Sequence, residues 1–409
     1  MIKKIVSSFY WKLYQSRYVR YVLSYRYRIL FSKEHEAVSE FVENRGGNIV
    51  IAITASETYQ FSHIKPLYDE LAKDLSYSII LIASNPEKMQ SPVYQKFLEK
   101  NNYRVNKDVF SYIWLSILKP DIFIETAITS YRHLCPAITR KILLAHSVSS
   151  IGFSKDHAHI RNAVEYDYVV STGPYQKKVL ELAADQFKVT LPEVFHGGFI
   201  RGDLLAAKNA GFDRLDFLEK CGLADRKTVL FAPTWGEFSA TAEWIDPVVD
   251  LCVELGLNLM VKLHPHMLGG QSKWKTAGID WHNKLDTLRG NKGVHVCGEF
   301  DVEEYMLAAD IMLTDVSSVG LEYMFLGKPV FFLPAPRFFE IFGKDKPIFW
   351  LRNGLEVQDI VELKERLVIT DGEPEHDPDF YIRKLSFHPG KAVTSIGGFI
   401  KTIASSVKK

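Results

Sequence analysis

Cysteine is scarce in this chain, and its positions argue against two common kinds of site. The 409 residues contain four cysteines, and no two of them form a Cys-x-x-Cys pair. Widely spaced cysteines in apolar or helical surroundings predict buried thiols rather than a disulfide framework or a zinc site. Buried thiols are typical of proteins kept in a reducing compartment, so we expect a cytosolic chain without a metal centre.

Long apolar runs and a strong net charge are also missing. No window reaches the roughly 18 consecutive apolar residues that span a bilayer, and the amino terminus has no apolar core followed by a small-residue cleavage site. The formal net charge is +1, so no global field would draw the chain to nucleic acid. We therefore expect a protein that does not cross the membrane, is not exported and binds no nucleic acid.

Acidic residues are absent from the first 33 positions, where basic and aromatic residues alternate instead. Five tyrosines recur there at steps of four and three, which places them on one face of a helix: Tyr10, Tyr14, Tyr18, Tyr21 and Tyr25. Tyrosine favours the bilayer interface, and each Lys or Arg near an anionic leaflet adds about 1 kcal/mol of attraction. Residues 1–33 are thus predicted to bind an anionic membrane surface. The first alternative is a stripe that packs against the protein's own body or a partner helix, and nucleic acid binding by this segment is a weaker third interpretation.

Beyond this segment, short apolar runs recur at intervals that leave room for helices. The first series comprises residues 48–54, 77–83, 121–125, 141–146 and 168–171, and the second comprises residues 228–232, 257–263, 294–296, 311–313 and 330–333. Such alternation predicts an α/β chain of two doubly wound domains. We expect the first domain over residues 34–205, the second over residues 226–385, and a carboxyl-terminal helix over residues 386–409 that packs across the domains.

The second domain contains the most informative motif. An apolar strand over residues 311–313 ends in Thr314 and Asp315, Ser317 and Ser318 follow, and a helix-period run leads to the next strand. Ligands of parallel sheets bind beyond the carboxyl ends of the strands, where helix amino termini offer N–H groups. The two serines are therefore candidates for holding a phosphate. The alternative is that Ser317 only caps the following helix.

Two further strand ends of this domain deliver reactive side chains. The strand before Pro233 is followed by Thr234 and Trp235. The strand at residues 257–263 contains Lys262 near its end and is followed by His264. An imidazole at a strand end can hydrogen-bond a phosphate oxygen or donate a proton to a leaving group. The alternatives are an ordinary proline turn with a packing tryptophan, and a structural histidine.

The first domain offers His146, which ends a buried strand and would act as a base for an incoming hydroxyl. A capped core histidine is the alternative. At the junction between the domains, Arg201 would either clamp a phosphate or form an ion pair with Asp203 that fixes the linker, and we favour the structural role.

Taken in order, these segments resemble the CDP-glycerol glycerophosphotransferase family, whose enzymes prime or polymerise teichoic acids and related phosphate-linked capsules. The resemblance covers about residues 140–335, and its most specific part runs from residue 301 to residue 329. Three shorter motifs precede it: residues 198–203 (Gly-Phe-Ile-Arg-Gly-Asp), 232–235 (Ala-Pro-Thr-Trp) and 262–265 (Lys-Leu-His-Pro).

The resemblance implies a GT-B fold of two facing Rossmann-like domains behind a membrane-associated amino-terminal helix. It also implies inverting, metal-independent transfer of a polyol phosphate from a CDP-activated donor to a lipid-linked saccharide at the cytoplasmic face of the membrane, with no cofactor. His264, Ser317 and Ser318 align with the family's donor phosphate-binding positions, and His146 with its catalytic histidine. On the same basis the donor-binding set is Thr234, Lys262, His264, Thr314, Asp315, Ser317, Ser318 and Glu322, supported by Arg201 and Trp235.

Four places depart from the family pattern. His146 is followed by Ser147-Val148-Ser149, where the family usually has glycine and then a Pro-Leu-Lys type sequence. Gly236 stands where an arginine is common, Val316 replaces the usual tyrosine, and Glu322 stands where aspartate is often found. The donor therefore stays open among glycerol phosphate, ribitol phosphate and a nucleotide sugar. A GT-B glycosyltransferase is the first alternative, a sugar-nucleotide 2-epimerase the second, and a nucleotide-binding scaffold without activity the third.

Overall fold

The computed structural model describes nine stretches of the chain: residues 31–54, 58–83, 92–144, 158–268, 272–298, 302–342, 351–352, 354–369 and 378–407. His146 and all but the last three residues of the predicted membrane-binding segment lie outside these stretches, so the predictions made for them stay predictions. Within the described helices, none combines the length and apolarity that crossing a membrane requires.

Seven parallel strands form the first sheet, in the order β3-β2-β1-β4-β5-β6-β7. They are β1 (Ile49–Thr54), β2 (Tyr77–Ala83), β3 (Val109–Ser111), β4 (Ile122–Glu125), β5 (Arg140–Leu144), β6 (Tyr168–Ser171) and β7 (Glu193–His196). The central strands are buried apolar runs, as expected for a parallel sheet with helices on both faces. The strand order reverses between β1 and β4, which is the usual ligand-binding position of such a sheet.

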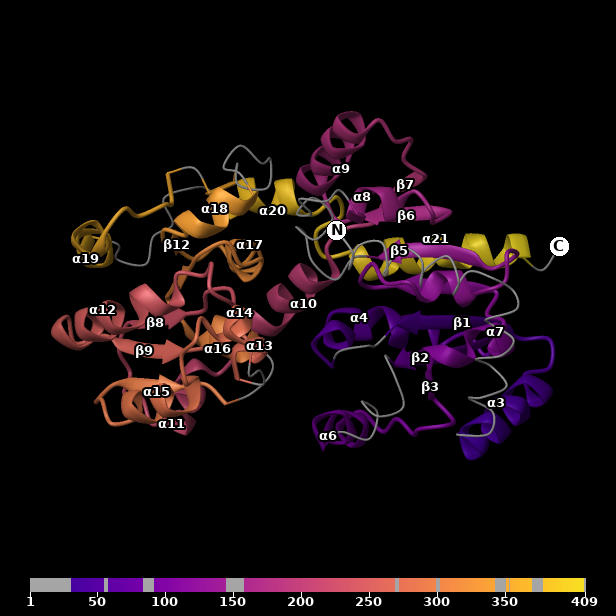
Figure 1. Ribbon diagram of the computed structural model, residues 1–409, viewed down its shortest axis with the longest axis horizontal. Coiled ribbons are helices and arrows are strands. Elements are labelled where there is room, and N and C mark those ends of the chain that lie inside the picture. The colour runs from indigo at the N-terminus through magenta and orange to yellow at the C-terminus, as the bar shows by residue number, and fades with distance from the viewer. Residues whose placement is uncertain are drawn as a thin grey trace.

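Helices follow most strands of this sheet, and together they form the first lobe (Figure 1). Its described helices are α3 (Ser32–Asn44), α4 (Thr58–Leu71), α6 (Pro92–Lys100), η1 (Tyr112–Trp114), α7 (Leu115–Leu118), η2 (Tyr131–Leu134), α8 (Ala158–Ala163) and α9 (Pro174–Phe187).

The second lobe is built on five parallel strands in the order β10-β9-β8-β11-β12. These are β8 (Thr228–Phe231), β9 (Asn258–Val261), β10 (Val294–Val296), β11 (Ile311–Thr314) and β12 (Val330–Phe332). Its described helices are α11 (Arg214–Lys220), α12 (Thr241–Glu254), α13 (Pro265–Leu268), α14 (Lys273–Thr276), α15 (Trp281–Leu288), α16 (Glu303–Ala308), α17 (Val319–Met324), α18 (Pro336–Phe342) and α19 (Ile360–Ile369).

Three helices connect the lobes. Helix α10 (Ile200–Asn209) leads from the first sheet to the second, and α20 (Pro378–Leu385) and α21 (Ala392–Val407) bring the chain back (Figure 1). Helix α21 packs in the first core, where Ile396 and Ile400 are fully buried beside Leu67 of α4. The last described helix therefore packs on the lobe that contains the first described strand.

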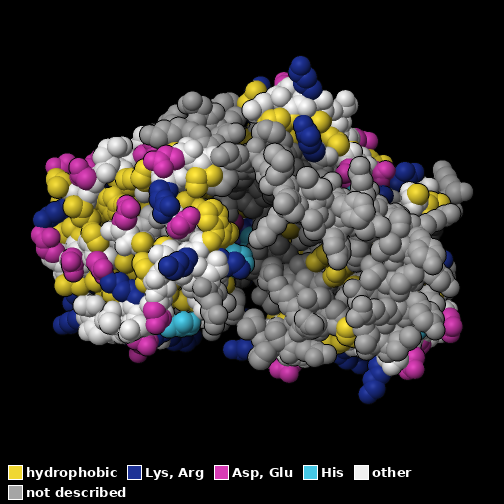
Figure 2. All heavy atoms as spheres, in the orientation of Figure 1, with side chains coloured by type: hydrophobic (Ala, Val, Ile, Leu, Met, Phe, Trp, Pro, Cys, Tyr) yellow, Lys and Arg dark blue, Asp and Glu magenta, His cyan; other side chains and the backbone are white. Residues whose placement is uncertain are grey.

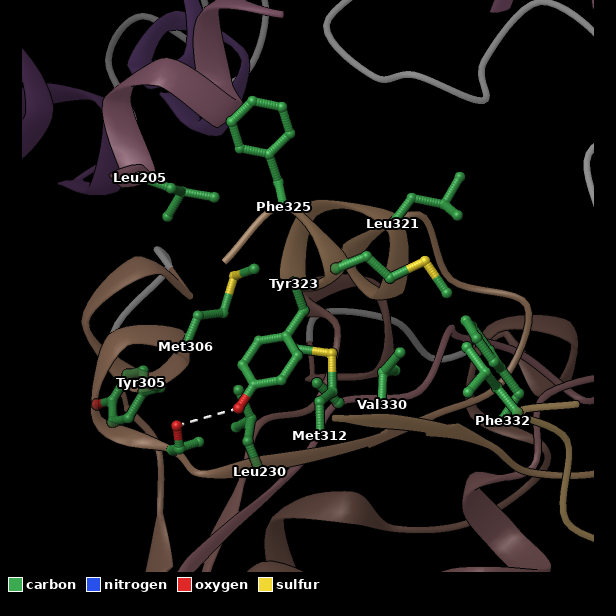
Figure 3. Packing of buried hydrophobic residues seen from close by; sticks show 14 of the residues in the cluster. Leu205, Leu230, Tyr305, Met306, Met312, Leu321, Tyr323, Phe325, Val330 and Phe332 are labelled. Atoms are coloured by element: carbon green, nitrogen blue, oxygen red, sulfur yellow. Dashed lines mark hydrogen bonds between the residues drawn. The ribbon is translucent and has the colours of Figure 1, made fainter. Parts of the chain in front are cut away.

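The second lobe has its own core around Tyr323, whose hydroxyl donates a hydrogen bond to the carbonyl oxygen of Ala309 over 3.0 Å (Figure 3). Apolar side chains of β8, β11 and β12 surround this ring, with Leu230, Met312 and Val330 among them. This packing sets helix α17 on the sheet, and α17 follows directly after the two serines.

Two parallel doubly wound sheets confirm the predicted α/β fold class, and ten of the twelve strands lie where the apolar runs predicted them. The short edge strands β3 and β7 were not predicted. The domain boundaries proposed from the sequence stay a prediction.

Candidate functional site

The candidate site lies at the carboxyl ends of three neighbouring strands, β9, β8 and β11, at the centre of the second sheet. The order of connection reverses between β8 and β11, so the loops after these strands diverge and leave room for a ligand. Thr234 follows β8, His264 follows β9, and Ser317 follows β11. The strand order thus brings together three of the segments singled out in the sequence.

Asp315 holds two of these loops in place. Its Oδ1 accepts hydrogen bonds from the backbone N–H of Thr234 over 2.7 Å and of Ser317 over 3.2 Å, while Oδ2 accepts one from Ala240 over 2.9 Å. The side chain is fully buried, and this burial raises the pKa of Asp315 although the three N–H groups oppose the rise. Asp315 therefore joins the loops after β8 and β11, and its contact with the donor stays a prediction.

Thr314 and Glu322 also lie inside the protein. The Thr314 hydroxyl donates to the carbonyl oxygen of Ala232 over 2.8 Å and is fully buried. Glu322 is 3% exposed and accepts a hydrogen bond from Arg201. Both side chains are thus buried and bonded to other parts of the protein, and their direct contact with a donor stays a prediction.

His264 is the central imidazole of the site, and its tautomer follows from one hydrogen bond. The backbone N–H of His266 donates to Nδ1 of His264 over 3.1 Å. The proton of the neutral ring therefore sits on Nε2, which becomes a hydrogen-bond donor. Burial, together with the nearby His266 and Lys262, lowers the pKa of His264 to about 3, so the ring is neutral at physiological pH.

The indole ring of Trp235 lies next to this imidazole. The Trp235 ring lies 6.1 Å from the ring of His264 and 5.0 Å from that of His266, centroid to centroid, and meets His266 edge to face. Trp235 is partly buried against the core of the second lobe. Its indole thus links the loop after β8 to the loop after β9, as Asp315 links the loop after β8 to the loop after β11.

The two serines remain partly exposed at this sheet edge. Helix α17 begins at Val319, with Ser318 at the N-cap position, and the Ser318 side chain makes no capping hydrogen bond. The expected alternative, in which Ser317 caps the helix, is therefore wrong. Because the Ser318 hydroxyl makes no capping bond, it can donate a hydrogen bond to a ligand oxygen.

Lys262 and Gly236 belong to the segments that follow β9 and β8. Lys262 is 8% exposed, and its charge acts on the neighbouring His264. Gly236 has a φ of +92°, and a Cβ there would lie 2.9 Å from the carbonyl oxygen of Trp274. A larger residue would be strained at this position, so the arginine common in the resembling family has no room here.

Arg201 lies at the junction of the lobes and does not reach the site. It is 2% exposed and forms ion pairs with Glu303 and Glu322. Asp203 instead accepts hydrogen bonds from the backbone N–H groups of Gly390 and Ala392. The expected pair between Arg201 and Asp203 is therefore wrong, whereas the structural role favoured for Arg201 agrees with its contacts.

Sequence reasoning missed three residues that shape this region. His266 sets the tautomer of His264, Glu303 pairs with Arg201, and the charge of Arg352 acts on Asp315. The His-x-His spacing could have indicated the first. Nothing local indicates the other two, because their partners lie at least 37 residues away in the chain.

A hollow separates the two lobes, and histidine and basic side chains are exposed on its second-lobe side (Figure 2). Over the part of the chain that the structure describes, no three His, Cys, Asp or Glu side chains are grouped to hold a metal ion. The arrangement can thus offer neutral hydrogen-bond donors to an anionic ligand: an imidazole Nε2–H and serine hydroxyls.

Comparison with known sequences identifies relatives with related functions. Residues 52–335 match the profile of the family described as CDP-Glycerol:Poly(glycerophosphate) glycerophosphotransferase. The teichoic acid poly(glycerol phosphate) polymerase of Bacillus spizizenii is 28% identical over 194 residues, which cover 44% of each chain. The enzyme of the same name from Staphylococcus epidermidis is 27% identical over 59% of this chain and 33% of its own. The chain thus spans less than half the length of these relatives.

Solved structures share the fold. The wall teichoic acid polymerase TagF, in a variant soaked with CDPG, superposes with a TM-score of 0.61 over 97% of this chain and 99% of its own, at 16% identity. The UDP-GlcNAc 2-epimerase of Methanocaldococcus jannaschii superposes with a TM-score of 0.58 over 87% of this chain and 99% of its own, at 14% identity. At these identities the likeness establishes the GT-B-like fold and nothing finer.

Proposed function

The chain belongs to the CDP-glycerol:poly(glycerophosphate) glycerophosphotransferase family, and from this premise we propose that it transfers glycerol phosphate from CDP-glycerol to a hydroxyl of a lipid-linked glycan or growing polymer. The observation that carries the proposal is the imidazole Nε2–H of His264 on a loop that Trp235 and Asp315 join to the serine loop. Such a set of neutral donors suits a diphosphate.

The chemistry would require little of the protein beyond alignment and charge stabilisation. The acceptor oxygen attacks the phosphorus that carries glycerol, a new P–O bond forms, and the bond to CMP breaks. His264, Ser317 and Ser318 would stabilise the charge that develops on the leaving CMP. His146, which the sequence predicts at the end of a strand of the first domain, would take the proton of the attacking hydroxyl.

The acceptor would be a lipid-linked saccharide, and the reaction would then take place at the cytoplasmic face of the membrane. The basic and aromatic residues within positions 1–33 support peripheral attachment there. Vesicle co-sedimentation tests this part: a chain without residues 1–33 should no longer pellet with vesicles that contain anionic lipid. If the shortened chain pellets as much as the full chain, residues 1–33 are not the membrane anchor. The proposed transfer activity does not depend on this result.

A thermal-shift screen tests the donor, because a ligand that binds only the folded state raises the melting temperature, by an amount that corresponds to about 2.7 kcal/mol at a hundredfold excess over Kd. We expect CDP-glycerol to raise it more than UDP-sugars or GDP-sugars do. A response to UDP-sugars alone would favour a glycosyltransferase or an epimerase, which the need for an acceptor then separates. Binding of CDP-glycerol without release of CMP, in the presence of acceptor, would indicate a scaffold.

A further inference from the structure

Helix α10 belongs to the cores of both lobes. Ile200 is buried in the core of the first lobe, whereas Leu205 is fully buried in the core of the second, next to Phe325 at the end of α17 (Figure 3). A Cβ at Gly202 would come within 2.8 Å of the Phe325 ring. The helix is therefore in close contact with α17 and cannot shift without disturbing two cores.

Charged groups are buried on the same helix. Arg201 donates from Nη1 to Glu303 of α16, and from Nε to Oε2 of Glu322 on α17 over 3.2 Å. All three side chains are at most 5% exposed, and Lys208 adds a second cation to Glu303. We call Arg201, Glu303 and Glu322 the Arg201 cluster. Removing charges from water costs about as much as such pairs return, so their value lies in the geometry they impose.

This geometry reaches the candidate site through α17. Glu322 lies four residues after Ser318, which is about one turn along the helix. The bond from Arg201 to Glu322 thus fixes the turn at whose start Ser318 stands. Asp315 joins the serine loop to the loop after β8, so α17 and the donor-binding loops are held together, and loosening the bond to Arg201 would shift them as one unit relative to α10.

On its other side, α10 is attached to the first lobe. Asp203 accepts hydrogen bonds from the backbone N–H of Gly390 at 2.6 Å and of Ala392 at 2.8 Å, where α21 begins. Helix α21 is itself buried in the first core. Two residues of the first turn of α10, Arg201 and Asp203, therefore contact the helix after the serine loop of one lobe and the last described helix of the other.

We propose that Arg201 and Glu322 are positioning residues of the transferase, which set the donor-binding loop of the second lobe at the distance and angle that the acceptor on the first lobe requires. This inference rests on the proposed function. It assigns neither residue a contact with substrate. It predicts that loosening the Arg201 cluster impairs transfer while leaving donor binding intact, because all the donor-binding groups lie within the second lobe.

Glu322→Gln is the sharpest variant, because the amide keeps an acceptor for Arg201 Nε but removes the charge. We expect the Kd for CDP, measured by calorimetry, to stay within about twofold, and the kcat of CMP release with acceptor to fall roughly tenfold to a hundredfold, the range caused by misplacement of reacting groups on the order of 1 Å. Small-angle scattering should show a broader distribution of lobe separations.

Glu304→Gln is the matched control, since Glu304 is the exposed neighbour of Glu303 on the same helix; it should change neither quantity. An unchanged kcat in Glu322→Gln would overturn the inference, and so would a parallel loss of CDP affinity, which would indicate a donor contact. If Glu322→Gln does not fold, Arg201→Lys is measured in the same way, and failure of both to fold would show a purely structural role. Failure of the proposed function is distinct: the wild-type protein would then bind no CDP and release no CMP.

Discussion

The backbone N–H of His266 donates a hydrogen bond to Nδ1 of His264 over 3.1 Å. Because the donor is a backbone group, the bond depends on the turn at Pro265 and not on the side chain of residue 266. It fixes the ring of His264 and holds its proton on Nε2. Because the pKa of His264 is lowered to about 3, mainly by burial, the ring would meet the donor as a neutral hydrogen-bond donor.

The first prediction concerns pH and folding. The pKa of His264 is about 6.5 in the unfolded chain and about 3 in the folded protein, so the unfolded state takes up the proton first, and stability falls as the pH drops below about 6.5. The slope is about 1.4 kcal/mol per pH unit. Urea unfolding of His264→Gln at pH 7.5 and 5.5 should therefore lose about 1.4 kcal/mol less than the wild type between the two values. Equal losses in both proteins would show that the ring titrates normally.

The second prediction concerns Asp315. An asparagine in its place offers one acceptor oxygen and an NH₂ group, so it cannot accept from Thr234, Ala240 and Ser317 together. Asp315→Asn should lower the free energy of unfolding by about 2 to 4 kcal/mol and weaken CDP binding at the same time. The control is Asp286→Asn, because Asp286 is exposed. Asp310→Asn is not suitable, since Asp310 also accepts a hydrogen bond from a backbone N–H. A variant with full stability and reduced binding would mean that Asp315 contacts the donor directly.

The third prediction concerns Gly236, where the backbone is left-handed and the carbonyl of Trp274 is close. Gly236→Ala should destabilise the protein by about 1 to 3 kcal/mol, and Gly236→Arg by more, as thermal unfolding would show. Gly211→Ala, where a Cβ would meet nothing within 4 Å, is the control. An arginine at position 236 that is tolerated and raises activity would show that the loop can adopt the family's usual conformation.

A fourth prediction concerns His146. If this residue is the base, His146→Ala should lower the kcat of transfer by about 10² to 10⁴-fold while the Kd for CDP-glycerol stays the same, because a base for the acceptor does not hold the donor. Stopped assays of CMP release and calorimetry measure the two quantities. Turnover near that of the wild type would show that His146 is not the base.

Most of the fold could be predicted because buried parallel strands appear as uninterrupted apolar runs. Strand β2 has the predicted bounds, Tyr77–Ala83, and so does β6, Tyr168–Ser171. The two missed strands are the edges of the first sheet. Strand β3 has only three residues, and β7 has four, of which Glu193 and His196 are polar, so neither differs clearly from a loop.

The candidate site was predictable where a reactive residue closely follows a buried strand, as His264 and Ser317 do. The sequence did not predict which of the polar residues in these segments face a ligand. Asp315 and Glu322 are polar residues within the most specific motif, yet both are buried and bonded to other parts of the protein. The partners of Arg201 lie 102 and 121 residues further along the chain, and only the packing of α10 between the lobes brings them together.

The most direct test of the account is the rate of CMP release from CDP-glycerol, with acceptor present, by His264→Ala compared with the wild type. Loss of the Nε2–H donor should reduce this rate by about 10² to 10³-fold, with the melting temperature of the free protein unchanged or raised at neutral pH. A variant that folds normally and releases CMP at a rate close to that of the wild type would contradict the assignment of His264 to the diphosphate.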